Sequence, residues 1–366
     1  MADGEQRRQN GDPGPTPAGR GLKQLAAVAT VTMFLVVVAG ALVTATGSGE
    51  GCGRSWPLCG SPVWTVQAVI EFSHRVVSGI AALAVVALAF LAPRRLGGRR
   101  DARWLAGVAV FFLFLQAGLG AGVVLWGQAD AVLALHFGIS LVSFASVALL
   151  SLRVWRAGTG SGPAEAAAPG AVAAAGAGGD GRETPKPGAG AGNTVPVPLR
   201  RWVWALLAYT YLVVYTGAYV RHTGSSLACP AWPLCGGPWE GAALVQMVHR
   251  LAAGVLLVGL FGLAAWARRY RDQAPGIVRA VQLAAALAVA QALSGAFVVF
   301  SRLDLAATML HSSIMALLFT VLCHGALEAA GPGWALGTDA SGITLGSGRA
   351  RPVTVPAPRF DPARRA

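Results

Sequence analysis

Residues 64–92 read WTVQAVIEFSHRVVSGIAALAVVALAFLA, an apolar run whose only charged side chains are Glu71 and Arg75. A helix needs about 20 predominantly apolar residues to cross a bilayer, so this run is long enough to do so. The run therefore predicts a transmembrane helix. Ionisable side chains are costly inside a membrane, which makes Glu71, His74 and Arg75 candidates for a functional role.

Seven other runs have the same character, at 25–45, 104–126, 131–155, 202–220, 242–266, 277–300 and 305–328. The whole chain of 366 residues is 54% hydrophobic and only 12% charged, whereas soluble domains carry roughly 25% charged residues. A large soluble helical protein is therefore disfavoured. The sequence predicts an all-α, polytopic membrane protein with eight transmembrane helices.

Basic residues set the expected orientation. Most of the 29 Lys and Arg lie on one side of the predicted membrane, in the N-terminus, 94–103, 153–201, 268–279 and the tail. The positive-inside rule then predicts a plasma-membrane protein with both termini in the cytoplasm and the cysteine-containing loops outside. The basic residues behind the net charge of +13 lie at the ends of the apolar runs. They therefore indicate a lipid surface and not a nucleic-acid partner.

Composition divides the chain into five parts. Residues 1–22, the Ala-, Gly- and Pro-rich linker 157–199 and the tail 330–366 have few large apolar side chains. Such segments cannot offset the entropy of ordering, so we expect them to be disordered and cytoplasmic. Two four-helix bundles are expected between them, at 23–156 and 200–329.

The two predicted bundles repeat each other. Glu71, His74, Gln116 and His136 are followed 175 residues later by Gln246, His249, Gln291 and His311. Each half contains an even number of predicted helices, so both halves enter the membrane from the same side. This predicts a pseudo-twofold axis along the membrane normal.

Four histidines lie inside apolar runs, two in each half: His74, His136, His249 and His311. One such histidine would more often make an interhelical hydrogen bond, but two matched pairs favour a ligand-binding role. A structural zinc ion needs four convergent ligands. Two separate pairs of imidazoles instead fit the axial positions of two hemes. His222 and His324 have no counterpart in the other half and are expected at the surface.

Other residues could complete these sites. Small residues would give a porphyrin room: Gly79, Gly118, Gly120, Gly122, Gly138, Gly254 and Gly295. Arg75 and Arg250 each follow a histidine and either bind heme propionates or extend to the outer interface. Glu71 shares a helical face with His74, but the second half has Gln246 at that position. The carboxylate either makes the first half the catalytic one or is a structural partner of Arg75.

The predicted outer loops hold two cysteine pairs, Cys52 with Cys59 and Cys229 with Cys235. Each pair encloses Trp-Pro-Leu, a rigid turn that could bring the sulfurs together. Disulfides persist outside the cytoplasm. The pairs are therefore expected to be oxidised, either as structural links or as redox-active groups.

Together, TGSGEGCGRSWPLC at 46–59, the Glu71-x-x-His74-Arg75 motif and the four spaced histidines resemble the heme A synthase family, particularly its Bacillus-type bacterial members. The resemblance covers about 23–328. It implies that the methyl group at ring carbon 8 of heme O is oxidised to a formyl group with oxygen from water, giving heme A for terminal oxidases.

The resemblance also implies a role for each site residue. His74 and His136 would flank the substrate heme O, Glu71 would be catalytic, and His249 and His311 would bind a resident heme b. Heme O synthase and cytochrome oxidase assembly factors would be partners. A diheme b-type electron carrier without substrate turnover is the alternative function, and a transporter with a parallel repeat would leave the histidine pairs unexplained.

Overall fold

The computed structural model describes residues 19–60, 63–127, 129–157 and 195–331. The segments predicted to be disordered at the N-terminus, in the linker and in the tail lie almost entirely outside these ranges. The first and last helices and the linker-flanking helices lie within them.

Eight long helices make up nearly all of the described chain. They are α1 (Arg20–Ala45), α2 (Val66–Arg95), α3 (Arg100–Trp126), α4 (Asp130–Ala157), α5 (Val197–His222), α6 (Gly241–Ala267), α7 (Pro275–Phe300) and α8 (Leu305–Ala330). All eight are long and apolar enough to cross a membrane, and the described residues contain no strand. The prediction of an all-α protein with eight membrane-spanning helices is confirmed.

The helix ends follow local chemistry. The Thr65 hydroxyl oxygen accepts a hydrogen bond from the Ala68 amide at the start of α2, and Asp304 does the same for Ala307 at the start of α8. Such side chains satisfy amides that have no partner within the helix. Several helices extend a few residues beyond the apolar runs; α2, for example, continues through Arg94 and Arg95.

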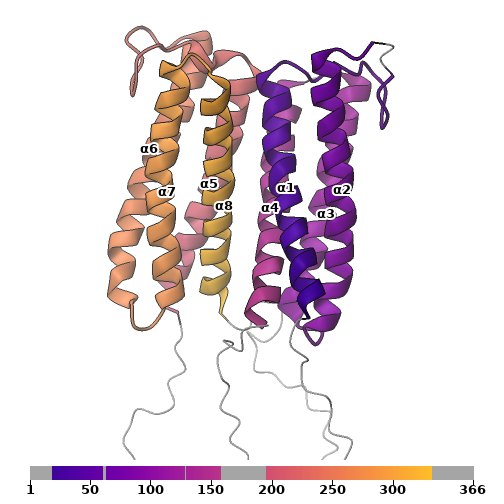
Figure 1. Ribbon diagram of the computed structural model, residues 1–366. Coiled ribbons are helices and arrows are strands. Elements are labelled where there is room, and N and C mark those ends of the chain that lie inside the picture. The colour runs from indigo at the N-terminus through magenta and orange to yellow at the C-terminus, as the bar shows by residue number, and fades with distance from the viewer. Residues whose placement is uncertain (1–18, 61–62, 128, 158–194, 332–366) are drawn as a thin grey trace, which may run out of the picture. The chain divides into compact units, whose positions relative to one another are not determined.

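The helices stand side by side (Figure 1). In the first half α1 and α3 each pack against α2 and α4, and in the second half α5 and α7 each pack against α6 and α8. Helix α4 also contacts α5 and α8, and α1 contacts α8. The halves therefore share an interface made by α1, α4, α5 and α8. Their pseudo-twofold relationship stays a prediction.

Helix α4 lies at the centre of this interface. In the most apolar 18-residue stretch of α4, 61% of the residues are buried inside the protein, compared with 33% in that of α2. Two buried serines on α4 have hydrogen-bond partners within the protein: Ser146 donates to its own helix, and Ser151 bonds to Thr30 of α1 at 2.8 Å. Large apolar side chains face outward elsewhere, including Leu83, Phe111 and Val258. Such continuous apolar surface suits lipid contact.

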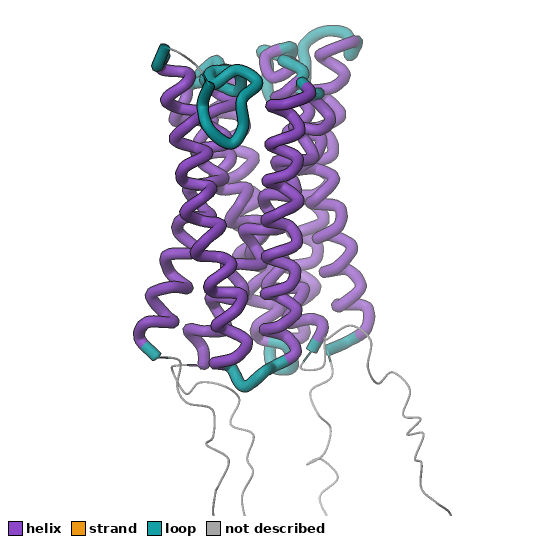
Figure 2. The backbone as a smooth tube through the Cα atoms, turned by 90° about the vertical axis from the view of Figure 1, so that its right-hand side faces the viewer, coloured by secondary structure: helices purple, strands orange, loops and turns teal. Residues whose placement is uncertain are grey.

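Connecting loops lie at both ends of the helices (Figure 2). The loops joining α1 to α2 and α5 to α6, which carry the cysteine pairs, lie at the same end (Figure 1). The ends of α2 and α6 that are rich in arginine lie at the opposite end. Which side of the membrane each end faces stays a prediction.

Candidate functional site

Both cysteine pairs form disulfides. Cys52 is bonded to Cys59 with an S–S distance of 2.07 Å, and Cys229 to Cys235 with 2.09 Å. In each loop the first cysteine is buried and the second is half-buried. The predicted pairing is confirmed.

Glu71 and Gln246 attach these loops to their helices. Oε2 of Glu71 accepts a hydrogen bond from the Cys52 amide at 2.8 Å, and Oε1 of Gln246 accepts one from the Cys229 amide at 2.7 Å. Both side chains are buried, with exposed fractions of 4% and 3%. Gln246 also donates from Nε2 to the Ser226 carbonyl at 2.5 Å. The two residues therefore share one structural role, and the carboxylate charge is what distinguishes Glu71.

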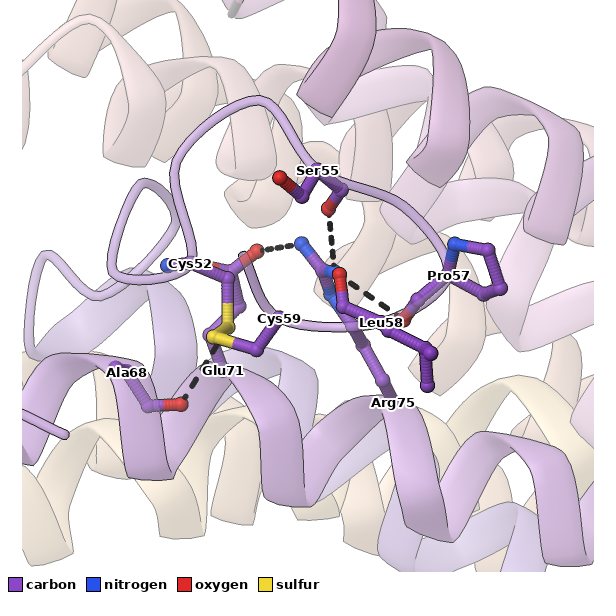
Figure 3. A network of polar contacts seen from close by, with 8 residues as sticks. All are labelled: Cys52, Ser55, Pro57, Leu58, Cys59, Ala68, Glu71 and Arg75. Atoms are coloured by element: carbon purple, nitrogen blue, oxygen red, sulfur yellow. Dashed lines mark hydrogen bonds and ion pairs between the residues drawn. A yellow bond between two sulfur atoms is a disulfide. The ribbon is translucent and has the colours of Figure 1, made fainter. Parts of the chain in front are cut away.

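Arg75 completes the attachment in the first half (Figure 3). It forms an ion pair with Glu71, and its Nη1 donates to the carbonyls of Ser55 at 2.7 Å, Leu58 at 3.2 Å and Pro57 at 3.3 Å. The Arg75 guanidinium is thus held against backbone carbonyls of the disulfide loop. Its contact with a heme propionate stays a prediction.

Arg250 makes the matching contacts in the second half. Its Nη1 donates to the Ala231 carbonyl at 2.6 Å and the Pro233 carbonyl at 3.3 Å. Because Gln246 carries no charge, Nη2 of Arg250 turns instead to the Cys229 carbonyl at 2.9 Å. Arg250 also lines the cavity described in the next paragraph, where it could make its predicted contact with a heme propionate.

An open cavity of about 780 Å³ lies mainly in the second half. His249 of α6 and His311 of α8 both line it, together with Gln246, Gln291, Arg250 and Arg221. Ala41, Thr44 and Phe137 of the first half close one side. Cofactor pockets commonly measure about 300–1,000 Å³ and are mostly apolar with a few convergent polar groups. The size and lining of this cavity fit a heme between two imidazoles.

A glycine on the neighbouring helix faces each of the four histidines. A Cβ atom added to Gly40 would lie 3.4 Å from Cε1 of His74, and one added to Gly120 would lie 3.3 Å from Cε1 of His136. In the second half, a Cβ atom added to Gly217 would lie 2.7 Å from Cε1 of His249. One added to Gly295 would lie 3.2 Å from Cε1 of His311. These glycines let each imidazole lie directly against a helix backbone. Close approach of this kind is a common reason for glycine inside a helix.

The glycines that were predicted to give a porphyrin room have different surroundings in the structure. Gly120 and Gly295 lie against histidines, whereas Gly138 lies against Tyr211 of α5 and Gly122 against Trp126. Gly79, Gly118 and Gly254 have no atom near the position of an added Cβ within the described residues. Gly40 and Gly217 were missed, although both lie seven residues before the matching Gly47 and Gly224 and belong to the same repeat.

In the first half, His74 and His136 lie close enough to interact electrostatically. Nδ1 of each imidazole and Oε1 of Gln116 are buried and have no hydrogen-bond partner among the described residues. Buried polar atoms without partners are rare and call for an explanation such as a missing ligand. Two neighbouring imidazoles are the donor set that a heme iron takes, so this histidine pair fits a heme here as well.

His222 and His324, both expected at the surface, are only partly exposed. His222 ends α5, is half-buried and lines the cavity beside Arg221. His324 is half-buried on α8, and its Nε2 lies 3.3 Å from Nη2 of Arg156 on α4. Glu328 accepts a hydrogen bond from the same arginine at 3.1 Å. The contact of His324 with Arg156 joins α8 to α4, and no repeat pattern encodes it.

Eight apolar helices define a multi-pass membrane protein, and it carries two matched pairs of histidines within those helices. Comparison with known sequences identifies its family. The profile of the cytochrome oxidase assembly protein family COX15-CtaA matches residues 62–177, 200–239 and 237–323. The chain belongs to this family.

Curated relatives cover most of the chain. It is 41% identical over 314 residues to the heme A synthase of Geobacillus kaustophilus, covering 83% of this chain and 90% of the relative. The identity to the heme A synthase of Bacillus licheniformis is 40% over 313 residues, covering 83% of this chain and 95% of the relative. The resemblance seen in the sequence motifs is confirmed.

Proposed function

We propose that this protein is a heme A synthase, a membrane oxidoreductase that converts the methyl group at ring carbon 8 of heme O into the formyl group of heme A, with oxygen from water. The observation that carries the proposal is the repeated pair of half-buried histidines inside the helices, of which only the first pair has a neighbouring carboxylate. Family membership and relatives named heme A synthase support the same activity.

The two halves would bind different hemes. His74 and His136 would bind the substrate heme O, and His249 and His311 would hold a resident heme b in the cavity of the second half. When bound, heme b supplies a redox centre that passes on the electrons removed from the substrate. Arg75 and Arg250 are the candidate propionate contacts, in addition to their contacts with the loops.

Glu71 would be the catalytic group of the first half. Its carboxylate is buried and fixed by the Cys52 amide and by Arg75. A fixed carboxylate can accept a proton from attacking water or stabilise positive charge that develops at the methyl carbon. Fixing it in advance lowers the cost of reorganisation during the reaction.

The proposed setting is the plasma membrane, with both termini in the cytoplasm and the disulfide loops outside. The disulfides at one end of the helices and the basic residues at the other support this orientation. Heme O synthase is the expected supplier of substrate, and cytochrome oxidase assembly factors are the expected recipients of product.

The activity is tested by expressing the full chain in membranes that make heme O but lack other heme A synthases. Extracted hemes are separated by chromatography, and we expect heme A together with heme b. His249→Ala and His311→Ala should each remove the tightly bound heme b. Heme b without heme O or heme A would instead indicate an electron carrier without substrate turnover.

A further inference from the structure

The two histidine pairs differ in what holds their imidazole rings. In the second half each Nδ1 lies beside a hydroxyl on the neighbouring helix. Oγ1 of Thr216 on α5 is 3.1 Å from Nδ1 of His249, and Oγ of Ser294 on α7 is 2.8 Å from Nδ1 of His311.

The direction of these hydrogen bonds follows from the other contacts of the hydroxyls. The Thr216 hydroxyl donates to the Val213 carbonyl at 2.9 Å, and the Ser294 hydroxyl donates to the Gln291 carbonyl at 2.9 Å. A hydroxyl has a single proton, so each oxygen is left to accept from the histidine. When each hydroxyl donates to its carbonyl, the proton of His249 and that of His311 lie on Nδ1.

This tautomer leaves Nε2 unprotonated in both rings. Neutral imidazole binds iron through an unprotonated nitrogen, and the hydrogen bond at the other nitrogen fixes both the tautomer and the orientation of the ring. Both rings line the same cavity. Nε2 of His311 lies 3.1 Å from Nε2 of Gln291, so this amide must move aside before His311 can bind iron.

The first half lacks both hydroxyls. The repeat places Ala39 where the second half has Thr216, next to the matched Gly40 and Gly217. It places Leu119 where the second half has Ser294, next to Gly120 and Gly295. Accordingly, Nδ1 of His74 and Nδ1 of His136 have no hydrogen-bond partner in the part of the chain that the structure describes.

We infer that Thr216 and Ser294 are positioning residues that make the second heme site permanent, and that Ala39 and Leu119 keep the first site exchangeable. The inference rests on the proposed function and explains how one repeated scaffold provides both a resident cofactor and a substrate that must leave as product. Rings that are free to reorient bind iron less tightly than rings that are fixed in advance.

The test compares the purified full-length protein with a Thr216→Val/Ser294→Ala double variant. Heme b transfer to excess apomyoglobin is followed by absorbance, and the midpoint potential of heme b is measured by redox titration. Loss of an outer hydrogen-bond partner typically weakens metal binding by about 10- to 100-fold, so we expect transfer to be faster by a factor in this range. The potential should rise, because imidazole without an acceptor at Nδ1 donates less electron density to the iron.

A Thr216→Ser/Ser294→Thr variant is the matched control, because it keeps both hydroxyls and should retain the parent transfer rate and potential. The reverse exchange, Ala39→Thr/Leu119→Ser, should raise the ratio of heme O plus heme A to heme b in the purified protein. A Thr216→Val/Ser294→Ala variant that matches the parent in transfer rate and potential overturns the role of the hydroxyls. An unchanged heme ratio in the reverse exchange overturns the explanation of exchangeability.

These outcomes are separate from a failure of the proposed function. If His249→Ala keeps heme b undiminished, the assigned ligands are wrong, whatever the hydroxyl variants do. If His249→Ala loses heme b while the hydroxyl variants behave like the parent, the ligands stand and only the positioning role fails.

Discussion

Glu71 and Gln246 bind the same backbone group in the two halves, the amide of the first cysteine in each disulfide loop, at 2.8 and 2.7 Å. Glutamine therefore fulfils the structural role in the second half without a charge. This equivalence means that a Glu71→Gln substitution removes the charge and leaves the loop attachment available, with the chain itself supplying the precedent.

We predict that Glu71→Gln abolishes or strongly lowers heme A formation, while heme b content and the Cys52–Cys59 disulfide stay at parent levels. The carboxylate charge is lost, but the amide oxygen can still accept from Cys52. Heme extraction with chromatography measures the first effect, and non-reducing mass mapping measures the second. A near-normal heme A yield would show that Glu71 only holds the disulfide loop and is not catalytic.

A second prediction concerns Gly217. An added Cβ would lie 2.7 Å from Cε1 of His249, closer than the two atoms can approach, so the imidazole or α5 must shift. Alanine is favoured over glycine within a helix by about 1 kcal/mol, yet Gly217→Ala should lower the heme b content. Absorbance spectra of the purified variant report the loss.

Gly40→Ala is the control for Gly217→Ala. Its added Cβ would lie 3.4 Å from Cε1 of His74, an ordinary van der Waals contact, and it lies in the other half. Heme b content should therefore stay at the parent level. Equal heme b contents in the two variants would contradict the close packing of His249 against α5.

The helices and the histidine pairs were predictable from the sequence because each depends on a local pattern. Apolar length defines a membrane helix, and the shared spacing of His74, His136, His249 and His311 exposes the repeat. Even the disulfides followed from short loops that each hold one pair of cysteines.

Contacts between helices were not predictable in the same way. The carbonyl contacts of Arg75 and Arg250 depend on the path of each disulfide loop, and the burial of His324 depends on α4 lying against α8. The hydroxyls beside His249 and His311 lie on other helices, 33 and 17 residues away. Aligning the two halves would have revealed Thr216 and Ser294 as differences, but not that they face imidazoles.

A third prediction concerns the interhelical contact between Ser151 and Thr30. Ser151→Ala removes a hydroxyl that bonds Thr30 at 2.8 Å and the Ala26 carbonyl at 3.1 Å. Thr30 keeps its own bond to that carbonyl at 2.9 Å, so no donor loses its last partner. We expect destabilisation of about 0.6 kcal/mol, the average for interhelical hydrogen bonds in membranes. Unfolding in mixed micelles of increasing SDS content measures it, with Ser146→Ala, whose hydroxyl bonds only within α4, as the control. A loss above ~2 kcal/mol would show that Ser151 does more than this contact.

The fourth prediction uses the two arginines that hold the disulfide loops. Arg250 donates to three loop carbonyls, those of Cys229, Ala231 and Pro233. Hydrogen bonds from charged groups contribute about 1.5–3 kcal/mol each, so Arg250→Gln should let the loop open more often.

Opening exposes the buried sulfur of Cys229, because its disulfide is otherwise covered by the loop and α6. Arg250→Gln should therefore speed reduction of Cys229–Cys235 by dithiothreitol and leave the rate at Cys52–Cys59 unchanged. Arg75→Gln should have the opposite selectivity, since the loop carbonyls that Arg75 contacts belong to the first loop. Alkylation of the released thiols followed by mass mapping gives both rates in one sample, so each protein carries an internal control. Equal acceleration of both disulfides by either substitution would point to a general loss of stability and would refute the loop-specific role of the arginines.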